Sequence, residues 1–171
     1  SHNNIDCGLA AISLDGNSIE NVIVSNNNIT GGSVGIRVFD ASDSHTIKNN
    51  TISGCTYGIS VEGEGHTIKD NIVEAYNDYG IYMENTEDTT VTNNTIKDNG
   101  DGIYLKDSDS NTISDNTIKD NDGDGIYLTG SDSNTISNNT LSDNEDYEIY
   151  LVSNSDDNIL IGSVSDVFVS S

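Results

Sequence analysis

A short hydrophobic motif recurs along the whole chain, and this repetition limits the folds that the chain can adopt. The motif is Gly-Ile-x-Leu or a close variant, and it returns about every 23 residues, the kind of fixed period that solenoid proteins show. Its isoleucines are Ile12, Ile36, Ile59, Ile81, Ile103, Ile126 and Ile149. A second motif, Ile-x-x-Asn-x-Ile, falls between copies of the first. Its asparagines are Asn3, Asn27, Asn50, Asn71, Asn94, Asn116 and Asn139.

Within one repeat, short runs alternate between apolar and polar residues. In residues 111–134 the inward positions of three short strands fall to Ile113, Ile118, Ile126 and Leu128. Runs this short, with no helical periodicity, predict an all-β fold: a right-handed parallel β-helix of about seven coils of roughly 22–24 residues, with three short parallel sheets. We expect residues 1–171 to form a single β-helix domain, as a fragment or module of a longer or polymerising protein.

Stacking of equivalent residues predicts what each column of side chains does. The first inward column is expected to contain Val24, Ile47, Ile68, Val91, Ile113, Ile136 and Ile159. The asparagines of the second motif are expected to form an amide ladder, in which each side chain bonds its neighbours one coil away. Gly162 takes the expected asparagine position in the last coil, so the ladder should end there.

The charge of the chain is one-sided, with 29 Asp and Glu residues against 6 Lys and Arg residues and a net charge of −23. Such a surface repels nucleic acid and anionic membranes and favours cations or a high-salt medium. The sequence also has no apolar run long enough to span a bilayer. We therefore expect neither nucleic-acid binding nor membrane insertion.

The repeats also carry a family resemblance. The chain resembles the right-handed parallel β-helix repeat superfamily, in particular the modules of carbohydrate-binding and sugar-hydrolase proteins and of archaeal and bacterial surface proteins. The runs at residues 125–128 and 134–140 are similar to the copper-processing accessory protein of nitrous oxide reductase. The resemblance covers the whole chain. It implies that the Gly-Ile-x-Leu strands form a sheet whose outer face carries the site in many relatives.

The outer face of that sheet holds two groups of candidate site residues. Tyr82, Tyr104, Tyr127 and Tyr150 are expected to form an aromatic ridge, which suits sugar rings or a partner surface, or which simply stabilises the sheet. Beside the ridge, Arg37, Glu62, Glu84 and Lys106 are expected to cluster. They are the catalytic candidates if the protein is an enzyme, because polysaccharide lyases and glycosidases use such carboxylates and cations.

Acidic loops suggest a structural Ca²⁺ site. Residues 120–125 read Asp-x-Asp-x-Asp-Gly, the opening of an EF-hand-type loop, although position twelve is Ser131 instead of Glu. The carboxylates expected to contribute are Asp98, Asp101, Asp120, Asp122 and Asp124. Copper is a weaker expectation, since the soft donors form no obvious ligand group in the sequence. Those donors are His2, His45, His66, Met83, Cys7 and Cys55.

The regular period favours a non-catalytic, extracellular or cell-surface module of a surface-layer, adhesin or fibre protein, stabilised by cations. The alternative is a carbohydrate-active protein, binding or cleaving a polysaccharide on the Gly-Ile-x-Leu face. The expected partners are a polysaccharide or copies of the chain, assembled head to tail or laterally. Four asparagines also lie in Asn-x-Thr sequences that permit glycosylation: Asn28, Asn49, Asn93 and Asn138.

Overall fold

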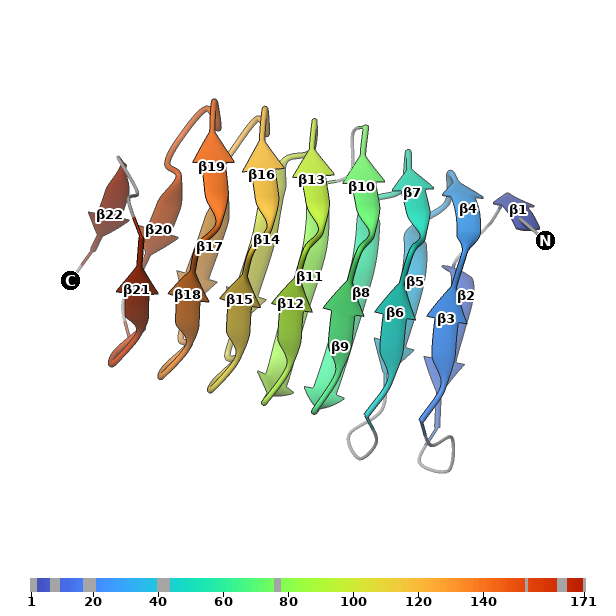
Figure 1. Ribbon diagram of the computed structural model, residues 1–171, viewed down its shortest axis with the longest axis horizontal. Helices are drawn as coiled ribbons and strands as arrows, with labels where there is room; N and C mark the ends of the chain where they lie inside the picture. The colour runs from blue at the N-terminus through green and yellow to red at the C-terminus, as the bar shows by residue number, and fades with distance from the viewer. Residues whose placement is uncertain are drawn as a thin grey trace.

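The computed structural model describes residues 3–6, 10–16, 21–39, 44–75, 78–152, 154–162 and 166–170, with side chains from residue 10 onward. These residues form 22 short β-strands wound about one long axis, and they contain no helix (Figure 1). Accordingly, no helix in the described part of the chain could cross a membrane. The prediction of an all-β parallel β-helix is confirmed.

The strands belong to three parallel sheets that run the length of the molecule. Sheet A contains β1 (Asn3–Asp6), β4 (Asn27–Thr30), β7 (Thr51–Ser53), β10 (Ile72–Glu74), β13 (Thr95–Lys97), β16 (Thr117–Lys119) and β19 (Thr140–Ser142). Sheet B contains β2 (Ala10–Asp15), β5 (Val34–Phe39), β8 (Tyr57–Glu64), β11 (Tyr79–Glu87), β14 (Asp101–Lys106), β17 (Ile126–Thr129), β20 (Ile149–Leu151) and β22 (Val167–Val169). Sheet C contains β3 (Ile23–Ser25), β6 (Thr46–Lys48), β9 (Thr67–Lys69), β12 (Thr90–Thr92), β15 (Thr112–Ser114), β18 (Thr135–Ser137) and β21 (Ile159–Ile161). In Figure 1, sheets A and C form the upper and lower rows in front, and sheet B lies behind them.

Equivalent residues of successive coils stack on one another. In sheet B, Ile81 pairs with Ile59 on one side and with Ile103 on the other. The inward isoleucines of the central coils, Ile81 and Ile103 among them, are fully buried. Burying one such side chain is worth about 1.5–3 kcal/mol, so a few aliphatics per coil suffice when every coil repeats them.

The register of the last coil differs from our prediction. Ile136 pairs with Leu160, one residue later than the expected Ile159, which instead pairs with Thr135. Ile159 is 53% exposed, so it does not extend the inward column. The cause is the longer connection into this coil, which moves the strand by one position and reverses the faces on which its side chains lie.

Candidate functional site

The corner between sheets C and A is built on a buried asparagine ladder. The backbone N–H and the Nδ2 group of Asn71 both donate to Oδ1 of Asn94, at 3.0 Å each. The Nδ2 group of Asn71 also donates to the carbonyl oxygen of Ile47. The same pattern joins Asn27, Asn50, Asn71, Asn94, Asn116 and Asn139. The predicted ladder is therefore confirmed for these six residues, while the side chain of Asn3 lies outside the described part.

In the described residues the ladder ends at Asn139, one coil before Gly162. Because Ser137 pairs with Ile161, the next residues along both strands, Asn138 and Gly162, face each other. Gly162 therefore lies opposite Asn138 and not opposite the ladder residue Asn139.

A second ladder at the start of sheet C was missed by our sequence analysis. Each backbone N–H donates to the side chain of the equivalent residue one coil later, over 2.8–3.2 Å. The members in order are Val22, His45, His66, Thr89, Asn111, Asn134 and Asn158. The available signal was positional, because a His, Thr or Asn directly precedes the Thr-Ile, Thr-Val or Ile-Leu start of each strand.

The two described histidines are members of this second ladder, and their ring nitrogens face backbone groups. His45 and His66 are buried, and their rings stack at 5.5 Å between centroids. Nδ1 of His66 accepts the backbone N–H of His45, so the ring hydrogen is on Nε2, which faces the carbonyl oxygen of Glu62 at 3.2 Å. Each imidazole nitrogen of His66 is thus committed to a backbone partner, and the histidines replace asparagine in the column.

The remaining soft donors in the described part of the chain are also built into the core. Met83 is fully buried, and Cys55 is 2% exposed with its Sγ 3.2 Å from the carbonyl oxygen of Gly31. Within the described ranges, no three His, Cys, Asp or Glu side chains are placed to hold a metal ion together. These residues therefore do not fit a copper site. His2 and Cys7 lie outside the described residues.

The outer face of sheet B carries a continuous array of aromatic rings, larger than the predicted ridge. It contains the predicted Tyr82, Tyr104, Tyr127 and Tyr150 together with Tyr57, Tyr79, Tyr147 and Phe168. Successive rings lie 4.8–5.5 Å apart between centroids, and several pairs are nearly parallel. Coplanar rings side by side could not approach so closely, so the rings overlap by their faces. Inside this tyrosine array, ring faces are covered by neighbouring rings.

Two aspartates take the places of rings in one of the two columns of this array, between Tyr79 and Tyr147. Tyr79 pairs in register with Asp101, and Asp101 Oδ1 accepts the backbone N–H of Asp124 at 2.9 Å. Asp124 Oδ1 in turn accepts the backbone N–H of Tyr147 at 3.0 Å. Burial, reinforced by the charge of Asp101, raises the pKa of Asp124 to about 7. Burial likewise raises the pKa of Asp101 and, with neighbouring tyrosines, the pKa of Tyr104 to about 12.

At the N-terminal end of the tyrosine array, the structure brings three of the four catalytic candidates into one groove of about 240 Å³. The groove is lined by Val34, Arg37, Val38, Phe39, Tyr57, Ser60, Val61, Glu62, Tyr82 and Glu84. The guanidinium of Arg37 lies over the Phe39 ring at 4.8 Å. Lys106, the fourth candidate, is one coil further on and forms an ion pair with Glu84.

The hydrogen bonds around Glu84 set the protonation of this groove. Lys106, which donates to Glu84, lowers the pKa of the Glu84 carboxyl below its ordinary value. The Tyr82 hydroxyl also donates to Glu84 at 3.1 Å. Burial and this hydrogen bond raise the pKa of Tyr82 above its ordinary value. At neutral pH the groove therefore offers an ionised carboxylate and a neutral phenol.

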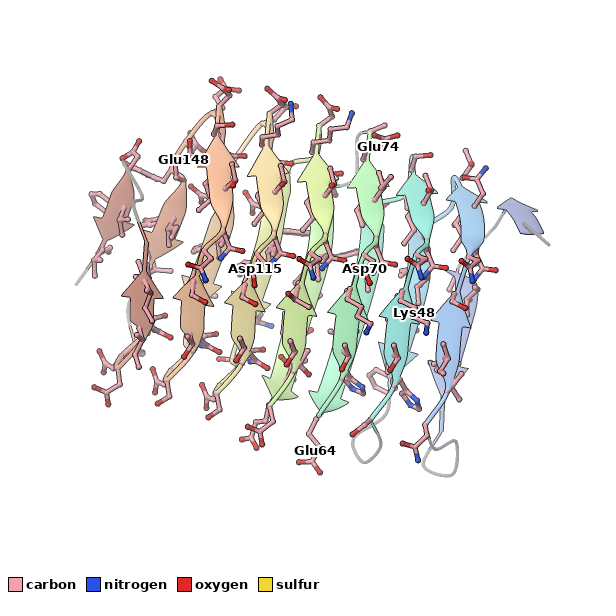
Figure 2. The ribbon with its side chains drawn as sticks, viewed as in Figure 1. Lys48, Glu64, Asp70, Glu74, Asp115 and Glu148 are labelled. Carbon is pink, nitrogen blue, oxygen red and sulfur yellow. The ribbon has the colours of Figure 1, made fainter. Side chains whose placement is uncertain are left out.

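The five predicted Ca²⁺ ligands fall into two separate groups. Asp98, Asp120 and Asp122 are exposed and line a pocket on one side, whereas Asp101 and Asp124 belong to the tyrosine array. Asp98 pairs with Lys97, and Asp120 pairs with Lys119. The acidic residues are instead spread around the windings, as Figure 2 shows for Glu64, Glu74 and Glu148. The structure gives no specific support for the Ca²⁺ site.

Comparison with known proteins shows which structures and which family the chain resembles. Among solved structures, it is similar to the A-module of the mannuronan C-5 epimerase AlgE6 of Azotobacter vinelandii, with a TM-score of 0.55 and 15% identity. The alignment covers 96% of this chain but 57% of that module, and identity this low shows the fold alone. No match was found among curated proteins. Residues 3–162 match the family described as periplasmic copper-binding protein (NosD). Because that match spans nearly the whole β-helix, the chain belongs to the NosD family.

Proposed function

We propose that this chain is a non-catalytic scaffold and adhesion module, located at the cell surface or outside the cell, that binds a saccharide chain on the outer face of sheet B. The observation that carries the proposal is the groove at the end of the tyrosine array. There, aromatic rings and charged hydrogen-bonding groups meet, the combination by which proteins hold sugar rings.

The end of the array differs from its middle in the availability of ring faces. Tyr82 pairs in register with Ser60, so no aromatic ring follows it in its own column toward the N-terminus. Tyr57 meets Tyr82 edge-on, and Phe39 is 50% exposed. A sugar ring can therefore contact aromatic surface in the groove that is covered in the rest of the tyrosine array.

The protonation of the groove supports binding without turnover. Glycosidases need a carboxylic acid that stays protonated near neutral pH, and lyases need a free base. Glu84 is instead held as a carboxylate by Lys106, and the raised pKa of Tyr82 keeps its phenol protonated. The net charge of −23 further favours a neutral saccharide over an acidic one, unless cations screen the repulsion.

The name of the NosD family refers to copper, but it does not supply a role for the described residues. His45, His66, Met83 and Cys55 are buried within the ladder and the core. We therefore base the proposed location outside the cytoplasm on the family relationship. The proposed saccharide ligand is based on the groove alone.

Affinity electrophoresis against neutral and acidic polysaccharides tests this proposal. We expect a neutral polymer to retard the chain. The affinity for that polymer should fall at least tenfold in Tyr82→Ala and in Arg37→Ala. The matched control is Lys69→Ala, whose strand β9 is in sheet C, and it should bind like the unmodified chain. Release of unsaturated or reducing ends that stops in Glu84→Gln would show an enzyme instead. Self-association without any saccharide binding would show that the partner is another copy.

A further inference from the structure

The exposed corner residues beside the buried asparagine ladder carry a second pattern. Each corner places one residue in the left-handed backbone region, with φ between 54° and 60°. From the second corner onward these residues are Asn49, Asp70, Asn93, Asp115 and Asn138, all with the side chain outside the ladder. Asn and Asp both tolerate this backbone, so turn formation alone does not explain why they alternate.

The asparagine corners differ from the aspartate corners in a chemical respect. Asn49, Asn93 and Asn138 each have threonine two residues later, in the sequences Asn-Asn-Thr. These are Asn-x-Thr acceptor sequences for N-glycosylation. The two intervening corners cannot accept a glycan, because an aspartate has no amide nitrogen.

The structure leaves room for a glycan at each of these positions. Asn49, Asn93 and Asn138 are exposed, and no described residue forms a hydrogen bond with their side chains. They lie on one line between sheets C and A, which Figure 2 marks by the labelled Asp70 and Asp115. This line is on the side of the molecule turned away from sheet B (Figure 1), so occupation there would not block the groove.

The spacing along the line also matches the size of the modification. Neighbouring corners are about 4.8 Å apart, whereas alternate corners are roughly 9–10 Å apart. A hexose ring with its hydroxyl groups is wider than one strand spacing but fits within two. Two glycans on adjacent coils would collide, and the aspartates occupy the positions where such a collision would arise.

We infer that Asn49, Asn93 and Asn138 are N-glycosylation sites that place a row of glycans along the corner between sheets C and A. In each transfer the Nδ2 nitrogen forms a bond to the anomeric carbon of a polyprenyl-phosphate-linked oligosaccharide. The bond from that carbon to the lipid phosphate oxygen breaks, the lipid phosphate leaves with the electron pair, and the amide loses one proton. The middle residue of each acceptor sequence is a ladder asparagine, Asn94 being 1% exposed, so transfer precedes closure of the coil.

The test is the intact mass of the folded chain secreted by a host whose secretory membrane carries an oligosaccharyltransferase. We expect three glycans, located by enzymatic release in heavy-oxygen water, which labels each former acceptor. Thr95→Val should remove the glycan of Asn93 alone. Thr117→Val is the matched control, because Thr117 pairs with Thr95 in sheet A but follows Asp115, and it should remove none.

The inference is overturned if the corner asparagines are unmodified in the secreted, folded protein, or if glycan is found on Asn28 alone. Asn28 is the fourth acceptor sequence and lies within strand β4, where it is partly buried. This inference does not depend on saccharide binding by sheet B. Loss of one result therefore leaves the other unaffected.

Discussion

The asparagine ladder and the tyrosine array are both columns of equivalent residues, yet they follow different rules. In the ladder every described position from Asn27 to Asn139 is asparagine, because each amide accepts from one neighbour and donates to the next. In one column of the tyrosine array, Asp101 and Asp124 take the places of rings, and the sheet continues. A buried column in which every side chain must accept from one neighbour and donate to the next therefore stays asparagine. The second ladder, whose side chains need only accept a backbone N–H, admits His, Thr and Asn, and the half-exposed stacked face admits Asp.

The largest expected effect comes from breaking the ladder in its centre. Asn94→Ala removes the acceptor for both the backbone N–H and the Nδ2 group of Asn71, which stay buried. It also removes the donor to Asn116. Since each buried donor left unsatisfied costs about 1–3 kcal/mol, we expect a loss of about 3 kcal/mol in the free energy of unfolding. Denaturant titration followed by circular dichroism measures it.

The control for this change is the adjacent corner residue. Asn93→Gly adopts the left-handed backbone without strain and adds no charge between the neighbouring corner residues Asp70 and Asp115. We expect a change below about 0.5 kcal/mol, as for most exposed substitutions. If Asn94→Ala were as mild as Asn93→Gly, the ladder would not be the element that stabilises the corner.

A smaller effect is expected in the centre of the tyrosine array. The ring of Tyr104 lies 5.1 Å from Tyr79, 5.5 Å from Tyr82 and 4.8 Å from Tyr127. Because such pairs contribute about 0.5–1.5 kcal/mol each and the face is partly solvated, Tyr104→Ala should lose about 2 kcal/mol. Tyr104→Phe retains the ring and should lose much less. Equal losses in the two variants would assign the effect to the hydroxyl group instead of stacking.

The stability of the fold should also depend on pH, through the aspartates in the tyrosine array. The pKa of Asp124 is raised to about 7 in the folded protein, so the folded state binds a proton more tightly than the unfolded state. The stability that this proton provides is complete below the unfolded pKa of about 4 and is lost as the pH rises to about 7.

Asp124→Asn isolates this contribution, because its amide oxygen can still accept the backbone N–H of Tyr147. The variant should be more stable than the unmodified chain at pH 8, and the difference should shrink toward pH 4. Melting temperatures across this range measure it. A difference that grows as the pH falls would contradict the raised pKa of Asp124.

The sequence allowed the repeating parts of this molecule to be predicted, because a fixed period translates directly into vertical neighbours. The isoleucine columns and the ladder from Asn27 to Asn139 needed only the spacing of the residues. The spacing also predicted part of the groove, because it put Arg37, Glu62 and Glu84 at outward positions near one another in the same sheet.

The other features depend on geometry that the period does not contain. Tyr57 and Tyr79 join the tyrosine array from a different strand position, so their contact with Tyr82 depends on side-chain direction. His45 suggests a metal ligand in a sequence, and only its hydrogen bond to the backbone of Val22 shows a structural role. The shift to Leu160 depends on how the last connection is accommodated, which the aliphatic pattern Ile-Leu-Ile leaves open.

The asparagine ladder also gives the solenoid an electrical direction. Every bond from one ladder asparagine to the next runs the same way: Asn50 donates to Asn71, Asn71 to Asn94 and Asn94 to Asn116. Group dipoles aligned head to tail add together, as they do along an α-helix, and each bond polarises the next. The two ends of the winding axis are therefore electrostatically unlike. The electrostatic energy of a molecule that approaches along the axis therefore depends on which end it approaches, even before the two surfaces touch.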